Sequence, residues 1–366
     1  MTATDTFACK PLIRICIAFA MLLPLGEIAI ADSTSDDGAP QQNSFIKRLE
    51  KAKQGSTVDQ FVVGYAYYRG EGVQPDPYTA AQWLRKAADA GDPRAQTALA
   101  DMYETGRGLE RDEVEAVKWL RRAAVSQYAI AQYNLAIMYY AGKGVKADYD
   151  EAAALFSKAA QKNNDMAEAN LGILYLYGRG VPKDQRLGAQ WIRKSAKQHS
   201  AFGEFNMGWC YEQGLGVEKN EREAAKWYRK AVDDGSNAAK NNLGRFYEKG
   251  IGVEQNPVEA ARLFRSAGEQ GDATAFLNLA VIHIKGIGVT RDLPEAYMWF
   301  TLAREYRAPA LSPDKIAIFE QVGKLLTKEQ LESAQTKASS LRQQFKGNEK
   351  YYSASIEDSG PSSLVH

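Results

Sequence analysis

One pattern recurs at a fixed spacing of 36 residues through most of the chain, and it constrains the fold more than any other feature. Seven glycine pairs mark this pattern: Gly70/Gly72, Gly106/Gly108, Gly142/Gly144, Gly178/Gly180, Gly214/Gly216, Gly250/Gly252 and Gly286/Gly288. Successive copies follow each other without insertion or deletion. A constant period of this length is typical of solenoid proteins, in which each repeat packs only on its neighbours.

Each repeat predicts two helices, A and B, joined at the glycine pair. Val63, Ala66 and Tyr67 form an apolar stripe at helical spacing before Gly70. The first glycine is therefore expected to end helix A in a left-handed cap. Four residues after the second glycine stands a residue type that caps helix N-termini: Asp76, Asp112, Asp148, Asp184, Asn220, Asn256 or Asp292. We expect helix B to begin there.

Recurring large and small residues predict the core between the helices. Helix B carries one large apolar residue in a constant phase: Trp83, Trp119, Leu155, Trp191, Trp227, Leu263 and Trp299. A small residue three positions earlier, such as Ala80, leaves space for it. Helix A carries tyrosine in one phase in six repeats and His283 in the seventh. A cofactor box is an alternative, but the presence of these residues in every copy favours packing.

The stretch GKGV, from Gly142 to Val145, also resembles a phosphate-binding loop. A Walker loop needs Gly-x-x-x-x-Gly-Lys-Ser/Thr, and a dinucleotide fingerprint needs a third glycine. Neither pattern is present, and both would have to follow a strand. We therefore predict that this loop turns the chain and binds no nucleotide.

The repeat resembles the Sel1-like repeat family, which is related to the tetratricopeptide repeats. The repeat unit of this family reads approximately A-x-x-N-L-G-x-x-Y-x-x-G-x-G-V-x-x-D-x-x-x-A-x-x-W-x-x-x-A-A. The sixth repeat matches this pattern nearly completely, with the sequence AKNNLGRFYEKGIGVEQNPVEAARLFRSA over residues 239–267. The departures are Leu109 for Val, Leu155 and Leu263 for Trp, and His283 for Tyr. The resemblance implies an all-α fold, a right-handed α-solenoid of seven helix-turn-helix repeats over residues 59–306.

The segments outside the repeats are expected to cap the array. Residues 44–58 align with part of a repeat and predict an N-terminal capping helix. Thr327 and Gln330 form a capping box ahead of an amphipathic stretch, so residues 307–346 predict C-terminal capping helices. Residues 32–43 are interpreted as a flexible leader and the polar residues 347–366 as a disordered tail.

The first 31 residues predict a secretory signal peptide. Lys10 and Arg14 precede an apolar run over residues 15–26, and Ala29-Ile30-Ala31 offers a cleavage site after Ala31. An uncleaved anchor is the alternative, although the run is shorter than the roughly 20 residues that span a bilayer. Cleavage would leave Cys210 as the one cysteine. We expect an exported bacterial protein, periplasmic or secreted and without a membrane span after cleavage.

Charge and composition indicate neither a nucleic-acid partner nor a reaction centre. Lys and Arg number 46 against 45 Asp and Glu, so no overall charge calls for nucleic acid or an anionic membrane. The three histidines form no HExxH motif, and no metal site or cofactor is predicted. We interpret His199 as a turn residue, His283 as a packing residue and Cys210 as a buried thiol, while His366 falls in the tail.

Helix A offers a candidate binding surface. The residue before its core leucine is asparagine in five successive repeats: Asn134, Asn170, Asn206, Asn242 and Asn278. An amide can bond both groups of a peptide backbone, or alternatively the backbone of a neighbouring repeat. The predicted groove is completed by an apolar centre with a basic end, made of Tyr133, Tyr177, Trp209, Arg245 and Lys249. The alternative is that the aromatic rings fill the gap between A helices.

These observations predict a non-catalytic protein–protein interaction scaffold of the bacterial envelope, which binds a protein or peptide on the concave helix A face. The family resemblance implies adaptor roles in signalling, exopolysaccharide assembly or host interaction. A polysaccharide or peptidoglycan binder is the alternative, because Tyr133 and Trp209 can stack on sugars. A β-lactam-binding or hydrolysing enzyme is a third interpretation, although the relatives with that link carry a cysteine pair in each repeat.

Overall fold

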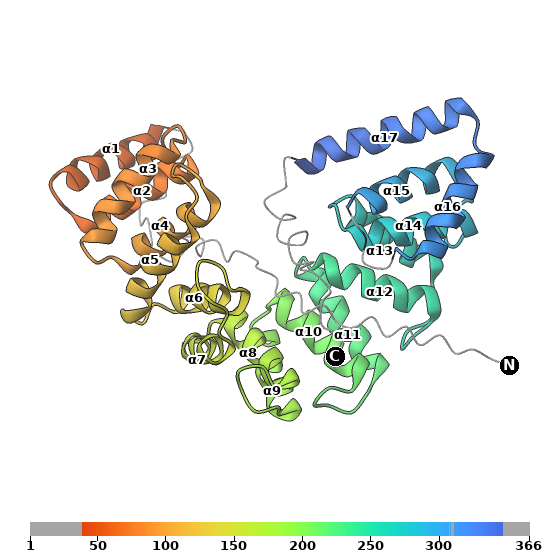
Figure 1. The fold of residues 1–366 in the computed structure, drawn as a ribbon, viewed down its shortest axis with the longest axis horizontal. Coiled ribbons are helices and arrows are strands. Elements are labelled where there is room, and N and C mark those ends of the chain that lie inside the picture. Colours follow the sequence, from red (N-terminus) through yellow and green to blue (C-terminus); the bar gives the residue numbers. More distant parts are fainter. Residues whose placement is uncertain (1–38, 307, 309–310, 347–366) are drawn as a thin grey trace. The chain divides into compact units, whose positions relative to one another are not determined.

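The computed structural model describes residues 39–306, 308 and 311–346, and every regular element in these ranges is a helix (Figure 1). The all-α prediction is therefore confirmed. The predicted signal peptide, residues 1–31, and the predicted tail, residues 347–366, lie outside the described residues. A search of the described helices found none with both the length and the apolar character that crossing a bilayer requires.

Contacts between residues divide the described chain into two compact units, residues 39–195 and 196–346. The first contains α1 (Ala39–Lys53), α2 (Thr57–Arg69), α3 (Pro77–Asp89), α4 (Pro93–Thr105), α5 (Glu113–Val125), α6 (Ala129–Ala141), α7 (Tyr149–Ala160), α8 (Asp165–Tyr177) and α9 (Gln185–Ala196, whose last residue falls in the second unit). The second contains α10 (Ala201–Gln213), α11 (Glu221–Asp233), α12 (Asn237–Lys249), α13 (Pro257–Gly268), α14 (Ala273–Lys285), α15 (Leu293–Glu305), α16 (Pro313–Leu325) and α17 (Lys328–Lys346).

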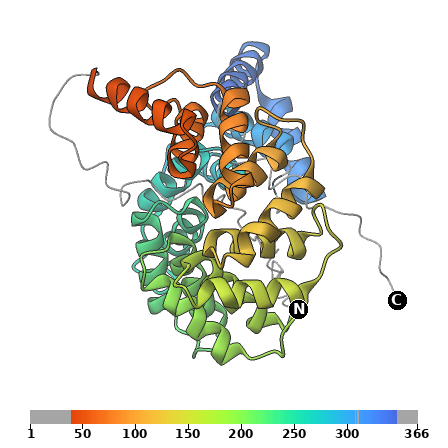
Figure 2. The ribbon, with the colours of Figure 1, turned by 90° about the vertical axis from the view of Figure 1, so that its left-hand side faces the viewer.

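Helices A and B alternate along both units. From α2 to α15 the even-numbered helices are A and the odd-numbered helices are B. Helix A packs on helix B of its own repeat, as α2 does on α3, and helix B packs on the next helix A, as α3 does on α4 (Figures 1 and 2). Within each unit, this nearest-neighbour stacking is that of an α-solenoid.

The two glycines of a pair have different roles, shown here for the third repeat. Gly142 has a φ of 68° and ends α6 in a left-handed cap, with its N–H donating to Met138. Gly144 has a φ of +63°, and a Cβ atom there would lie 2.1 Å from the carbonyl oxygen of Glu113 in the preceding repeat. The second glycine therefore lets one repeat approach the helix start of the repeat before it. The GKGV loop turns the chain, as predicted.

The large side chains that are most completely buried in helix B stand one position after the predicted tryptophan position. At this position no side chain is more than 3% exposed: Leu84, Leu120, Phe156, Ile192, Tyr228, Phe264 and Phe300. Trp83, Trp191 and Trp227 are only half-buried, which corrects their assignment to the core. A cation covers the outer side of these rings; the Lys230 ammonium, for example, lies 4.4 Å from the ring centre of Trp227.

The tyrosines of helix A are likewise half-buried, at the edge of the core. Arg121 donates to the Tyr139 hydroxyl at 2.8 Å, and Arg229 donates to the Tyr247 hydroxyl at 2.7 Å. Because each arginine belongs to the helix B before its tyrosine, these bonds join consecutive repeats. The polar hydroxyl explains why the ring stays at the edge.

Helices flank the repeats at both ends. α1 begins at Ala39, inside the segment predicted as a flexible leader, and its Pro40 falls in the first turn, where no N–H is needed. At the other end the predicted capping box is present: the N–H of Thr327 donates to Gln330 Oε1 at 3.0 Å, and the N–H of Gln330 donates to Thr327 Oγ1 at 3.2 Å. It begins α17, which packs on α15 and buries Ala338 and Phe345.

Candidate interaction site

In the unit of residues 39–195, the predicted groove residues take part largely in packing. Tyr133 is 1% exposed, and its ring lies 5.8 Å from that of Phe156. Asn170 is also 1% exposed, and its Nδ2 donates to the carbonyl oxygen of Met166 at 2.9 Å, one turn back in α8. Asn134 and Tyr177 are half-buried. Little of this stretch of helix A faces solvent.

In the unit of residues 196–346, the asparagines are half-buried and also bond within the protein. Asn206 donates to the carbonyl oxygen of Phe202 at 2.7 Å, and Asn278 donates to Asn241 Oδ1 at 3.4 Å. Asn242 lies within hydrogen-bonding reach of the Tyr228 hydroxyl. Asn170 and Asn206 thus bond the backbone of their own helix, and Asn278 bonds a side chain of the preceding repeat, so none of these three bonds is the expected one to the backbone of a neighbouring repeat.

Trp209 and Arg245 occupy one position of helix A in consecutive repeats, and both side chains are partly exposed. The next residue along the helix is buried in both repeats, because Cys210 and Phe246 are each 0% exposed. The same position is buried in the first unit at Ile137 and Ile173. Among the predicted groove residues, Trp209 and Arg245 are thus half-buried, as Asn134 and Tyr177 are, and Lys249 on α12 is exposed.

A polar network that includes the buried Tyr228 joins α10, α11 and α12 at this surface. Arg245 forms an ion pair with Glu212, and the Tyr228 hydroxyl donates to the other Glu212 oxygen at 2.6 Å. Burial first, and then the Glu212 carboxylate, raise the pKa of Tyr228, so the hydroxyl keeps its proton and remains a donor. Lys249 is exposed at the end of α12. The surface thus combines an indole, a paired guanidinium and an ammonium.

Two residues singled out in the sequence lie inside the second unit. Cys210 is 0% exposed, which agrees with its interpretation as a buried thiol. His283 is 5% exposed, and its Nε2 lies 3.3 Å from Arg265 Nη2. Burial lowers the pKa of His283, which favours the neutral imidazole that can accept from Arg265.

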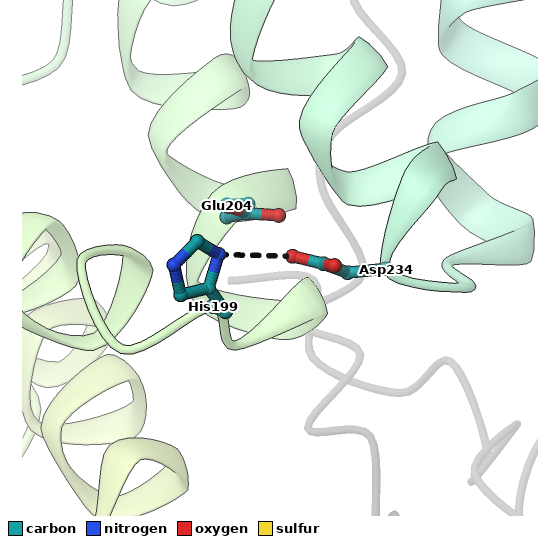
Figure 3. A group of neighbouring side chains, drawn as sticks. All are labelled: His199, Glu204 and Asp234. Atoms are coloured by element: carbon teal, nitrogen blue, oxygen red, sulfur yellow. Dashed lines mark ion pairs between the residues drawn. The ribbon is translucent and has the colours of Figure 1, made fainter.

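The third residue, His199, lies in a cluster that sequence reasoning did not find. His199 stands in the turn before α10 with a φ of +58°, and its Nδ1 lies 3.7 Å from Asp234 Oδ2 at the end of α11 (Figure 3). Glu204, in the first turn of α10, is 2% exposed beside them. One ligand atom from each of the three residues lies within 4.8 Å of the others.

The environment of Glu204 is unfavourable for a lone carboxylate. Burial, followed by the nearby Asp234 carboxyl group, raises the pKa of Glu204 to about 7. The sequence carried one signal of this cluster: Glu204 stands where Gln60, Gln96 and Gln132 stand in other repeats. A carboxyl group thus replaces an amide at a buried position.

Comparison with known proteins identifies the repeat. The family model of the Sel1 repeat matches residues 59–92, 93–124, 129–164, 165–200, 201–236, 237–272 and 275–305. A solved Sel1 repeat protein from Oxalobacter formigenes is 30% identical with a TM-score of 0.62, over 79% of this chain and 83% of that chain. A protective antigen present in uropathogenic Escherichia coli strains, with an SLR fold, is 30% identical with a TM-score of 0.49, over 89% and 76%. No curated protein matches the chain.

Proposed function

The chain belongs to the Sel1 repeat family, whose repeats mediate protein–protein interaction, and we propose that it is a non-catalytic scaffold of the bacterial envelope. Its partner is a protein or peptide that binds on the helix A face of α10 and α12. The envelope location rests on the signal-peptide pattern of residues 1–31. An adaptor role is consistent with a solenoid, because a preformed surface lowers the ordering cost of binding.

The partial exposure of Trp209 and Arg245, between buried neighbours, is the observation that carries this proposal. Tryptophan and arginine are the residue types that most often dominate the binding energy of protein interfaces. The ion pair with Glu212 holds Arg245 in place, so binding loses little side-chain entropy there. Lys249 adds an exposed positive charge that would favour an acidic segment of the partner.

Site-specific photocrosslinking in envelope extracts tests the proposed face. A photoreactive phenylalanine analogue replaces Trp209 in one variant and Val258 in the other. Val258 is a suitable control because it is 67% exposed on helix B of the next repeat. We expect a protein adduct from position 209 and none of the same mass from position 258. Equal adducts from both positions, or none from position 209, would contradict the proposed face.

Polysaccharide or peptidoglycan binding remains the second candidate, because a half-buried indole such as Trp209 can also stack on a sugar ring. Pull-down on purified peptidoglycan separates the two candidates. Retention that depends on Trp209 but needs no protein partner would favour the glycan, whereas retention unchanged in Trp209→Ala would count against it.

A further inference from the structure

The position of Glu204 carries a hydrogen-bond donor or a cation in four of the other six repeats, as Gln60, Gln96, Gln132 and Lys240, and Glu168 and Phe276 in the remaining two. It is glutamine in the first three repeats, and in the first two of these the Nε2 atoms of Gln60 and Gln96 donate to the carbonyl oxygens of Ala52 and Ala88 at 3.3 and 3.0 Å. These carbonyl groups lie near the end of the preceding helix. An ionised glutamate has no proton to donate, so at this position it faces acceptors and needs a positive charge.

Glu168, one repeat before Glu204, shows how the chain supplies that charge. The Lys194 ammonium lies 2.7 Å from Glu168 Oε1, 3.1 Å from Asn163 Oδ1 and 3.5 Å from the carbonyl oxygen of Ala160. Asn163 stands at the position of His199, one 36-residue step earlier. A cation is therefore held between the two residues that correspond to Glu204 and His199.

The next repeat arranges these positions differently. Lys230 corresponds to Lys194, and both ammonium groups lie over the tryptophan of their own helix, 5.4 Å from the ring centre of Trp191 and 4.4 Å from that of Trp227. Lys194 also forms an ion pair with Glu168, whereas Lys230 acts on Glu204 as a nearby charge without an ion pair among the described residues. Asp234, a second carboxyl group, faces Glu204 instead. The two carboxyl groups lie within hydrogen-bonding reach of each other, while the buried Oε2 atom of Glu204 receives no hydrogen bond from the described residues. Two carboxyl groups and an imidazole thus surround a point that an ammonium occupies in the preceding repeat.

We infer that His199, Glu204 and Asp234 bind one divalent transition-metal ion, with Zn²⁺ as the ion that fits best. One imidazole nitrogen and two carboxylate oxygens are a donor set that zinc accepts, with a fourth position left for water or an outside ligand. Two negative carboxylates would neutralise the ion, and the ion would satisfy the buried Glu204 oxygen.

The geometry allows the three donors to close on an ion. Zinc bonds of about 2.0–2.2 Å to nitrogen and oxygen place the ligand atoms of a tetrahedral site about 3.4 Å apart. The donors already lie within 4.8 Å, and His199 Nδ1 and Asp234 Oδ2 lie 3.7 Å apart. The His199 side chain is 87% exposed, so its ring can rotate toward the carboxylates without disturbing the core.

Zinc binding to the full chain, purified without a histidine tag and treated with a chelator, tests this inference. Calorimetric titration with ZnCl₂ should give one ion per chain, and Co²⁺ should give visible absorption of a nitrogen- and oxygen-ligated ion. His199→Asn and Glu204→Gln should each weaken zinc binding about tenfold or more, since each removes a ligand. Both substitutions introduce the residue that another repeat carries there, Asn163 or Gln96, so the fold should be retained.

Asp233→Asn is the matched control. Asp233 is the exposed neighbour of Asp234, and its substitution removes one negative charge, as Glu204→Gln does. Its zinc affinity should equal that of wild type. The inference is overturned if wild type binds no zinc, if His199→Asn and Glu204→Gln bind like wild type, or if Asp233→Asn weakens binding as much as they do.

Discussion

The ammonium of Lys194, on α9, lies 2.7 Å from Glu168 Oε1, in the first turn of α8, and the glutamate side chain is 0% exposed. Removing the cation leaves a buried carboxylate without its partner. We expect Lys194→Met to lower the free energy of unfolding by about 1–3 kcal/mol. Adding Glu168→Gln should recover most of this loss, because glutamine is the residue of Gln96 and donates its own hydrogen bond. Urea unfolding of both variants measures the effect; no recovery in the double variant would contradict this explanation.

The burial pattern of helix B predicts that substitutions at two adjacent positions of this helix, compared here in different repeats, change stability by unequal amounts. Phe264 is 1% exposed, and its ring packs on the backbone of Gly244, where an added Cβ would lie 2.7 Å away. Phe264→Ala should cost about 3–5 kcal/mol of unfolding free energy. Trp227→Ala should cost less than half as much, because Trp227 is only half-buried. Denaturant unfolding checks both values, and an equal or larger loss at Trp227 would contradict the assignment of the core.

The second glycine of a pair should be more sensitive to substitution than a glycine that only needs a positive φ. Gly91 has a φ of +95° and an added Cβ would meet nothing within 4 Å, so Gly91→Ala should cost about 1–2 kcal/mol from left-handed strain. Gly144→Ala adds a methyl group 2.1 Å from the Glu113 carbonyl oxygen, so it should cost clearly more. Thermal unfolding of the two variants in the same buffer compares their losses of stability. Equal losses would show that the close contact with the Glu113 carbonyl oxygen does not contribute to the cost of Gly144→Ala.

Stability should fall in mild acid because of His283. Its pKa is lowered from the ordinary 6.5, first by burial, with Arg265 acting in the same direction and Glu295 and Asp292 opposing. As the pH falls below 6.5, the unfolded chain takes up a proton that the folded chain does not, so the folded state loses stability. His283→Tyr, the residue of the other six repeats, should therefore raise Tm more at pH 5.5 than at pH 8.

The reverse exchange is the control for this prediction. Tyr247→His places a histidine at the same position of the preceding repeat, beside Arg229, which donates to the Tyr247 hydroxyl at 2.7 Å. This variant should acquire additional acid sensitivity. A Tm difference for His283→Tyr that does not change with pH would contradict the assigned origin.

Much of the local structure follows from the sequence because it depends on single residues. Gly142 ends α6 in the left-handed region, Asp148 accepts hydrogen bonds from backbone N–H groups at the start of α7, and Thr327 pairs with Gln330. Each depends on a residue type with a strong conformational preference at that place. Family membership and the helix order follow from the repetition of such residues.

Burial and side-chain pairing were less predictable, because they depend on which atoms of neighbouring helices meet. Periodicity marks a face of a helix but does not show which of two adjacent positions on it is buried more deeply. Phe264 is 1% exposed, whereas Trp227, which stands in the preceding repeat at the position of Leu263, is only half-buried. It also placed Tyr133 in a groove, whereas its ring is packed on Phe156. The cluster around Glu204 joins two turns that are separated in sequence, and only the packing of α10 on α11 brings them together.

The contact between a second glycine and the preceding helix start has a genetic consequence. Glycines at 108, 144 and 180 face the starts of α3, α5 and α7, in each case 31 residues earlier: Pro77, Glu113 and Tyr149. Because the spacing is the same each time, unequal recombination that removes or duplicates 36 residues here would still place a glycine opposite a helix start. Such an event would change the length of the array while every junction stays intact, so gene copies could gain or lose whole repeats without passing through a misfolded product.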